Sequence, residues 1–375
     1  MNIAEIRRLF PYLNTGKIYF NHASTAPLSL PVLDAIKSRL AEQSEGSIDD
    51  FLRFLKIADE TKNLLAAYLN TSAERIAFAD NTTNGINLLA QSLVWKKGDR
   101  IILNDIEFPA NVYPFLNLRK KGVEIDFVKS KNGRVNAEDI IDMISSKTKL
   151  ISISFVQFLS GYKADLRKIG KVCREREIIF CVDAIQGLGA LRIDVEKDFI
   201  DFISCGTQKW MLGLQGFSFV FITKVLQEKL DPAFAGWLGV VDAWNLLDYN
   251  LKLKSTAEAF QTGTVNTLGV FALNASLKLM NEFGFDEIEK RVISNSRYFI
   301  NELESAGIQP MLSGCSDNNL SGIISFKSDA AQQIFERLAK KNISSAVREG
   351  VVRLSPHFYN TKEEIDKVVR ELKSV

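Results

Sequence analysis

The chain has 375 residues, of which 46% are hydrophobic and 25% are charged, values that exclude disordered and fibrous classes and predict a large core with two domains. The formal net charge is +2 and the basic residues are scattered, which argues against nucleic acid or a charged membrane as partner and favours small molecules. Four cysteines without CxxC spacing and only two histidines argue against a disulfide framework and a metal site. Because neither a signal-peptide core nor a membrane span is present, we expect a cytoplasmic protein.

Short apolar runs alternate with helical patterns through the first half of the chain. The strand-like runs are 75–79, 100–105, 123–128, 149–156 and 178–183, and the helical patterns are 81–95, 111–122, 137–146 and 165–177. This alternation predicts an α/β fold in which helices cover both faces of a mainly parallel sheet. Ligands of such sheets bind at the carboxyl ends of the strands.

The pattern changes after about residue 260. A long helical stretch at 270–284 is followed by the strands 322–326 and 351–355 and by the helices 330–341 and 362–373. We therefore expect a smaller α+β domain at the C-terminus.

An acidic residue ends the last strand of the alternating region. Asp183 closes the apolar run IIFCVD, so its carboxylate is either a helix cap or a functional group at the ligand-binding edge. The GLGALR that follows lacks the third glycine of a dinucleotide fingerprint. A nucleotide-binding protein of the Rossmann type is therefore a weaker hypothesis.

A lysine follows the next apolar run, in the sequence CGTQKW. A lone lysine is usually a surface residue, but Lys209 stands between a predicted buried strand and a glycine-bearing turn. Together with Asp183 it forms the pair that pyridoxal 5'-phosphate requires. The lysine forms an imine with the aldehyde, and the aspartate keeps the pyridine nitrogen protonated.

Two further stretches supply groups that such a cofactor needs. NTTNGIN, residues 81–87, stands where a strand passes into a helix and offers hydroxyls and free amides to a phosphate, although a plain helix cap would read the same way. Phe108 follows the run 100–105 and could stack on the ring, although an isolated Phe is usually a core residue.

These residues carry a resemblance to a known family. The chain resembles the class V aminotransferases, pyridoxal-phosphate enzymes of fold type I that include cysteine desulfurases and selenocysteine lyases. The likeness runs from YFNHASTAP (19–27) to RLSPHFYNT (353–361), and its most specific pieces are VDAIQ, the pair Gln208 and Lys209, and FQTGTVNT (260–267). It implies a large domain with a seven-stranded, mainly parallel sheet at 17–258, and a small α+β domain formed by 1–16 and 259–375.

The resemblance also implies roles for individual residues. Lys209 would be the catalytic Schiff-base lysine and Asp183 the partner of the pyridine nitrogen, while His22 and Arg353 would bind the substrate, the arginine at its α-carboxylate. Thr264 would reach the phosphate of the neighbouring subunit, which implies a homodimer with shared sites. The remaining expected cofactor contacts are Thr82, Thr83, Phe108, Gln157, Gln186 and Gln208.

The sequence also departs from the desulfurases. Phe108 replaces their stacking histidine, Gln208 replaces the histidine before the lysine, and NISSAVREGVV (342–352) is short and lacks their sulfur-accepting cysteine. These differences argue against persulfide chemistry on a loop cysteine, in a desulfurase or a selenocysteine lyase.

The sequence therefore predicts a pyridoxal-phosphate enzyme that acts on a small α-amino acid by amino transfer or as a Cβ-substituent lyase. Lys209, once free, would act as the general base at Cα. Epimerase-like chemistry of the isopenicillin N epimerase type, kynureninase-like chemistry suggested by GWLG (236–239), a cysteine or selenocysteine lyase without the loop cysteine, and an inactive binding protein with the same fold remain alternatives.

Overall fold

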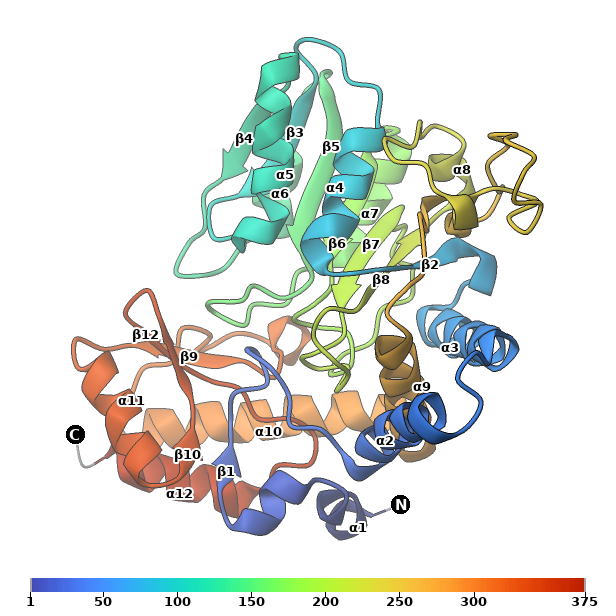
Figure 1. Cartoon of the computed structure of the whole chain (residues 1–375). Coiled ribbons are helices and arrows are strands. Elements are labelled where there is room, and N and C mark those ends of the chain that lie inside the picture. The colour runs from blue at the N-terminus through green and yellow to red at the C-terminus, as the bar shows by residue number, and fades with distance from the viewer. Residues whose placement is uncertain (1, 374–375) are drawn as a thin grey trace.

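A seven-stranded sheet forms the centre of the computed structural model, which describes residues 2–373 (Figure 1). The strand order is β2-β8-β7-β6-β5-β3-β4, and only β8 runs antiparallel to its neighbours. The strands are β2 (Ile76–Ala79), β3 (Arg100–Asn104), β4 (Glu124–Val128), β5 (Thr148–Ser154), β6 (Ile179–Asp183), β7 (Phe202–Gly206) and β8 (Ser218–Ile222). The predicted α/β fold with a mainly parallel seven-stranded sheet is confirmed.

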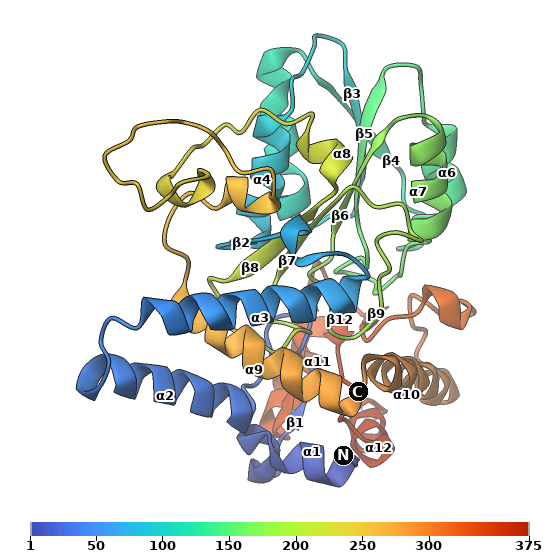
Figure 2. The ribbon, with the colours of Figure 1, turned by 90° about the vertical axis from the view of Figure 1, so that its right-hand side faces the viewer.

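Helices cover both faces of this sheet, as its central strands, which are buried along their whole length, require (Figure 2). Ile101 and Leu103 of β3 pack in one apolar cluster with α4 (Thr82–Ser92), α5 (Tyr113–Leu116) and α8 (Lys224–Gln227). Ile102, between them, packs in the cluster of the opposite face, with α6 (Ala137–Asp142) and α7 (Leu166–Glu175).

One expected helix differs from the prediction. Residues 111–122 carry a helical pattern, but the chain there forms only α5, flanked by the 3-10 turns η3 (Pro109–Asn111) and η4 (Asn117–Lys121). Pro114 explains the break before α5, because it lacks the backbone N–H that would continue a helix from the preceding turn.

The C-terminal part has a sheet and a core of its own. Its three strands, in the order β11-β12-β9, are antiparallel, and their apolar face packs on helices through Val352, Leu354 and Phe299. The elements are α9 (Thr267–Phe283), α10 (Phe285–Ser305), β9 (Ile324–Lys327), α11 (Ala331–Lys340), β10 (Ile343–Ser344), β11 (Ala346–Arg348), β12 (Val351–Leu354) and α12 (Lys362–Leu372). The expected smaller α+β part is present.

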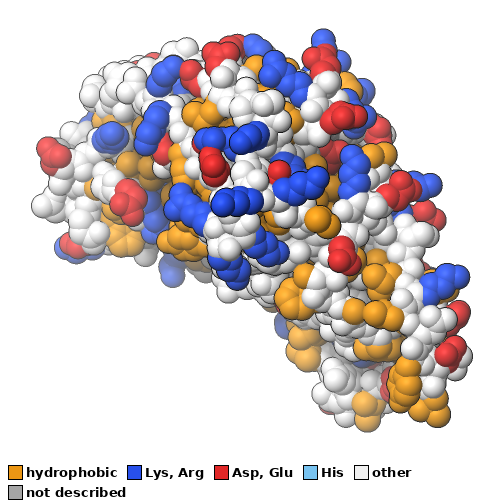
Figure 3. Space-filling model, turned by 90° about the horizontal axis from the view of Figure 1, so that it is seen from above, with side chains coloured by type: hydrophobic (Ala, Val, Ile, Leu, Met, Phe, Trp, Pro, Cys, Tyr) orange, Lys and Arg blue, Asp and Glu red, His pale blue; other side chains and the backbone are white. Residues whose placement is uncertain are grey.

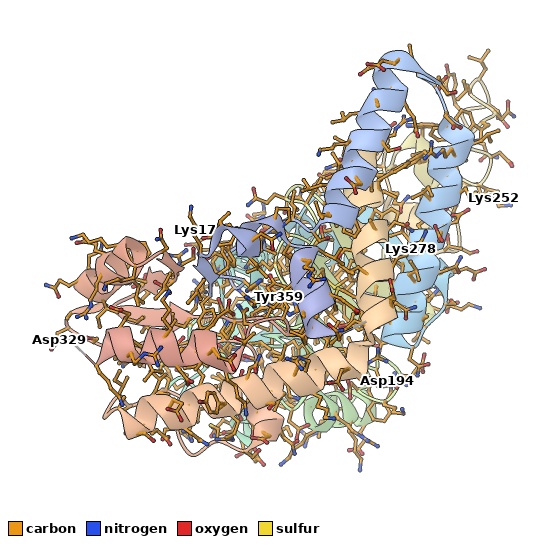
Figure 4. All side chains as sticks on the ribbon, turned by 90° about the horizontal axis from the view of Figure 1, so that it is seen from below. Lys17, Asp194, Lys252, Lys278, Asp329 and Tyr359 are labelled. Carbon is orange, nitrogen blue, oxygen red and sulfur yellow. The ribbon has the colours of Figure 1, made fainter. Side chains whose placement is uncertain are left out.

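The N-terminal segment lies mainly against this part, and its last helix also packs on the large sheet near β2 and β8. It contains α1 (Ile3–Arg8), η1 (Pro11–Thr15), β1 (Ile18–Tyr19), α2 (Leu30–Glu45) and α3 (Phe51–Leu69). Strand β1 pairs with β10, and α2 and α3 lie along α9 in an arm that extends from the molecule (Figures 2 and 4). The domain limits at residues 17 and 258 stay a prediction. Strand β1 follows the first of these limits, yet it pairs with β10 of the C-terminal part.

The surface is mixed in charge. Lys and Arg side chains alternate with Asp and Glu over the face seen in Figure 3, as the net charge of +2 leads one to expect. No helix within residues 2–373 is both long and apolar enough to span a membrane.

Candidate active site

A cavity of about 340 Å³ lies where the carboxyl ends of the large sheet face the β11–β12 hairpin. Asp183 ends β6, Lys209 follows β7, Thr82 follows β2 and Phe108 follows β3. The cavity is lined by Ala23, Ser24, Asn81, Thr82, Thr83, Phe108, Ala110, Phe158, Asp183, Ile185, Gln186, Gln208, Lys209, Arg348 and Arg353. It thus brings together eight of the side chains that the sequence singles out.

The pairing of β6 with β7 places Asp183 and Lys209 at the same cavity. The strands are parallel, and Asp183 lies opposite Ser204, so the chain reaches Lys209 soon after β7 ends. Asp183 is 2% exposed, and its Oδ1 accepts a hydrogen bond from the backbone N–H of Ile185 at 3.0 Å. Burial raises the pKa of this carboxyl, and the negative charge of Glu107 raises it further.

Lys209 is largely enclosed and lacks a fixed partner. Among residues 2–373 its Nζ forms no hydrogen bond or ion pair, and it lies 5.8 Å from the ring centroid of Phe108. Burial lowers the pKa of its ammonium, Asp183 opposes this effect, and the positive charge of Arg353 adds to it. The amine is therefore easier to deprotonate than that of an ordinary lysine, as a nucleophile or a base requires.

The start of α4 offers hydrogen-bond donors at one end of the cavity. Asn81 caps the helix by accepting a hydrogen bond from the N–H of Asn84 at 2.9 Å, while Thr82 and Thr83 occupy the first turn, where backbone N–H groups have no partner within the helix. The Oγ1 of Thr82 accepts a hydrogen bond from the N–H of Gly206 at 3.0 Å. Gln208 lines the same cavity.

Gly85 lets α4 lie this close to the sheet. A Cβ at this position would stand 2.2 Å from Oγ of Ser204 and 2.8 Å from Cγ1 of Val220. The helix start therefore holds its place over β7 and β8 only because residue 85 has no side chain.

Phe108 is placed by a buried carboxylate that the sequence analysis missed. Glu107 is 7% exposed and accepts hydrogen bonds from Nδ2 of Asn111 at 3.1 Å and from the N–H of Ser154 at 2.8 Å. Nε2 of Gln157 also donates to Glu107, at 3.0 Å. The position of Glu107 directly before Phe108, in DIEFPAN, is the one signal that points to it in the sequence.

Gln157 and Gln186 differ in their surroundings. Gln186 lines the cavity, but its amide is held by the protein: Nε2 donates to the carbonyl of Ala23, and Oε1 accepts from Nε1 of Trp210, both at 3.0 Å. Gln157 does not line the cavity, and its buried Oε1 has no partner within residues 2–373. Its contact with a cofactor stays a prediction.

Arg353 presents a buried guanidinium to the cavity. Its side chain is held by two hydrogen bonds of 2.9 Å, from Nη1 to the carbonyl of Phe158 and from Nη2 to Oγ of Ser24, while its buried Nε has no partner among the described residues. Burial lowers its pKa to about 10, and the nearby charge of Arg348 contributes. A guanidinium with a free donor and no ion pair suits a carboxylate ligand.

The expectation that His22 contacts the substrate does not fit its position. His22 is 0% exposed and does not line the cavity. Its Nδ1 lies 2.9 Å from the carbonyl of Ser355, and its Nε2 is hydrogen-bonded to the hydroxyl of Tyr359. Both ring nitrogens are thus occupied, whereas Ala23 and Ser24, which follow it, line the cavity.

Thr264 lies outside the cavity that holds Lys209. It lines a separate surface hollow of about 910 Å³ with Asn84, Asn87, Phe234 and Gln261. Within one chain Thr264 is therefore not part of the Lys209 cavity.

The arrangement fits pyridoxal phosphate. A deprotonatable lysine and a buried carboxylate share one cavity, unpaired N–H groups of a helix start offer donors to a phosphate, and the Arg353 guanidinium, which forms no ion pair within the described residues, remains for a substrate. No thiol lines this cavity, because all four cysteines are buried elsewhere in the described chain. The segment 342–352 forms β10, β11 and a tight turn into β12.

Comparisons with known proteins agree with this site. The family described as Aminotransferase class-V matches residues 18–368. A probable cysteine desulfurase of Methanothermobacter thermautotrophicus is 29% identical over all of this chain and 98% of its own, and the uncharacterized aminotransferase YcbU of Bacillus subtilis is 26% identical over 98% and 96%. The solved cysteine desulfurase of Thermococcus onnurineus superimposes with a TM-score of 0.90 at 22% identity, covering 100% of this chain and 98% of its own.

The fold and the family match define an enzyme that depends on pyridoxal phosphate. The chain belongs to the class V aminotransferase family, as the sequence predicts. Its substrate is accordingly an amino acid, and its chemistry is that of an aminotransferase or lyase.

Proposed function

We propose that this enzyme binds a small α-amino acid and removes the proton at Cα, leading to amino transfer or to loss of a Cβ substituent. The observation that carries the proposal is the meeting of Lys209, Asp183 and Arg353 in one cavity. The cavity volume of about 340 Å³ is near the lower end of the range for small-molecule sites. It therefore favours a small substrate beside the cofactor.

Each of the three side chains has a distinct role in the proposal. Bound pyridoxal phosphate supplies an electron-withdrawing ring that makes the Cα proton of an attached amino acid acidic. Arg353 binds the α-carboxylate through its guanidinium, Asp183 holds a proton on the pyridine nitrogen, and Lys209 binds the cofactor and later accepts the Cα proton as a neutral amine. Thr82, Thr83 and Gln208 hold the phosphate.

The site argues against sulfur transfer to a thiol of this chain. Burial raises the pKa of Cys205 and Cys315, and neither side chain lines the cavity. A Cβ lyase that releases its product needs no such thiol. One structural neighbour, with a TM-score of 0.89 at 21% identity, is described as the cystine C-S lyase C-DES in complex with cysteine persulfide.

We also propose a homodimer in which Thr264 completes the phosphate site of the neighbouring subunit. Thr264 lies at a surface hollow, and Phe234 in the same hollow is 67% exposed. Further large apolar side chains are exposed in the adjoining segment: Trp237, Trp244, Leu246, Leu247, Tyr249 and Leu251. Such a concentration of exposed apolar surface favours a protein partner.

A screen of amino acids tests the reaction. The cofactor-loaded enzyme is mixed with single amino acids, with and without a keto-acid acceptor, and the cofactor absorbance and products are recorded. Accumulation of pyridoxamine phosphate that a keto acid reverses identifies amino transfer, whereas release of a Cβ substituent without an acceptor identifies a lyase. If no amino acid changes the spectrum of the loaded protein, the proposal is wrong and the inactive binding protein is favoured.

A further inference from the structure

A second arginine lines the cavity, and the proposed chemistry gives it no role. Arg348 is the last residue of β11 and is exposed to solvent. Within the described residues its guanidinium forms one hydrogen bond, from Nη1 to the carbonyl of its neighbour Val347 at 2.8 Å, and no ion pair. The mouth of the cavity thus carries a guanidinium without a counterion.

The hairpin fixes where this guanidinium stands. Glu349 and Gly350 form a two-residue turn with φ of 49° and 71°, the left-handed conformation of the tightest hairpins. Arg348 pairs with Val351, and Ala346 pairs with Arg353. Because cross-strand partners share a face and alternate residues return to it, Arg348 and Arg353 lie on the same face as diagonal neighbours, roughly 7 Å apart at Cβ.

The opposite face of the hairpin explains why both arginines turn toward the cavity. Val352 and Leu354, which alternate with Arg353 along β12, are buried in the core of the small part. The strand is therefore apolar toward that core and basic toward the cavity. The short turn leaves Arg348 at the hairpin tip.

One basic side chain of the cavity has no acidic partner in the proposed function, in which Thr82, Thr83 and Gln208 hold the cofactor phosphate. Its lining contains three basic side chains (Lys209, Arg348 and Arg353) and one acidic side chain, Asp183. In the proposed function the Lys209 amine is neutral when it works and the α-carboxylate pairs with Arg353. A substrate with an uncharged side chain would then leave Arg348 unpaired beside another guanidinium, whose pKa it lowers.

We propose that Arg348 binds a second acidic group, so that the substrate is a small amino acid with an anionic side chain, such as a carboxylate or a sulfinate. This inference rests on the proposed function, because it takes Arg353 as the site of the α-carboxylate. A planar guanidinium fork suits either acid through paired hydrogen bonds.

Binding of non-reacting acids tests the inference without turnover. Succinate, glutarate and butyrate are titrated calorimetrically into the cofactor-loaded enzyme. We expect at least one dicarboxylate to bind about tenfold more tightly than butyrate, as one added charge-assisted contact would give. In Arg348→Gln the difference should fall to about twofold or less, with butyrate affinity reduced much less than that of the dicarboxylates, and Arg348→Lys should give an intermediate value.

Lys327→Gln is the matched control. Lys327 is an exposed residue at the end of β9, on the same three-stranded sheet, and does not line the cavity. This variant removes the same charge and should keep the preference for the dicarboxylate. The inference is overturned if the wild type shows no such preference, if Lys327→Gln loses it equally, or if Arg348→Gln weakens butyrate as much as the dicarboxylates.

The two proposals fail in different ways. If the loaded enzyme responds spectrally to neutral amino acids but not to aspartate, glutamate or cysteine sulfinate, only the inference on Arg348 is wrong. If no amino acid of either kind changes the spectrum, the proposed function fails.

Discussion

The reactivity of Lys209 depends on the charged groups around it. Burial and Arg353 lower the pKa of its ammonium, and Asp183 raises it. Its Nζ attacks an aldehyde only as the neutral amine, so the rate at which apo protein attaches pyridoxal phosphate should rise with pH. The midpoint of this rise should lie at a pH below the ordinary lysine pKa of about 10.4.

Two neighbouring substitutions should move this pH profile in opposite directions. Arg353→Gln removes a positive charge, so the pKa of Lys209 rises and the profile moves to higher pH. Asp183→Asn removes a negative charge, so the pKa falls and the profile moves to lower pH. Initial rates of the absorbance change, measured from neutral to alkaline pH, give the midpoint of each profile. If the profiles of the wild type, Arg353→Gln and Asp183→Asn superimpose, the charges of Arg353 and Asp183 do not act on Lys209.

At the scale of elements, the packing of α4 on the sheet makes a prediction with a definite sign. Gly85→Ala should destabilise the protein by about 1–3 kcal/mol, because the new Cβ meets Ser204 and Val220. It should also weaken cofactor binding, because the helix start with Thr82 and Thr83 must move. Helix propensity alone predicts the reverse, a gain of about 1 kcal/mol. Denaturant unfolding of the apo protein gives the sign of the stability change. A cofactor titration of the wild type and the variant measures the change in cofactor affinity.

The sequence predicts elements better than it predicts their partners. The apolar runs that end at Asp183 and precede Lys209 predict neighbouring strands, and β6 does pair with β7. The apolar pattern does not predict the antiparallel direction of β8, nor does it predict helices α2, α3 and α10. Strand direction depends on how the chain returns, here through residues 207–217 without a crossover helix.

Parts of the site could not be predicted because they depend on register. Arg348 and Arg353 share a face only because Glu349 and Gly350 form the turn. His22 lies in a segment that suggests a site, but a cluster with Tyr359 and His357 from the far end of the chain buries it behind the cavity. Such contacts join residues that no local pattern links.

At the scale of the whole molecule, the proposed dimer predicts complementation between two defective variants. Lys209→Ala lacks the attaching amine, and Thr264→Val lacks the hydroxyl proposed to reach the neighbouring phosphate. In a mixed dimer one site carries both substitutions and the other carries neither. Subunits mixed under exchange conditions should therefore regain up to a quarter of wild-type activity when roughly half the dimers are mixed.

The control is each variant mixed with itself, which should gain nothing. Sedimentation must show dimers in all samples. If mixed dimers form but activity stays at the level of the separate variants, Thr264 does not serve the neighbouring site. A monomer that is fully active would also contradict the shared-site arrangement.

In the proposed function, Lys209 is the residue to which the cofactor becomes attached, and every other role depends on it. The direct measurement is borohydride reduction of protein incubated with pyridoxal phosphate, followed by peptide mapping. We expect one stoichiometric label on the peptide that contains Lys209, and none in Lys209→Ala, while Lys327→Gln is labelled as the wild type is. A label on another lysine, or an unlabelled wild-type protein, would contradict the account.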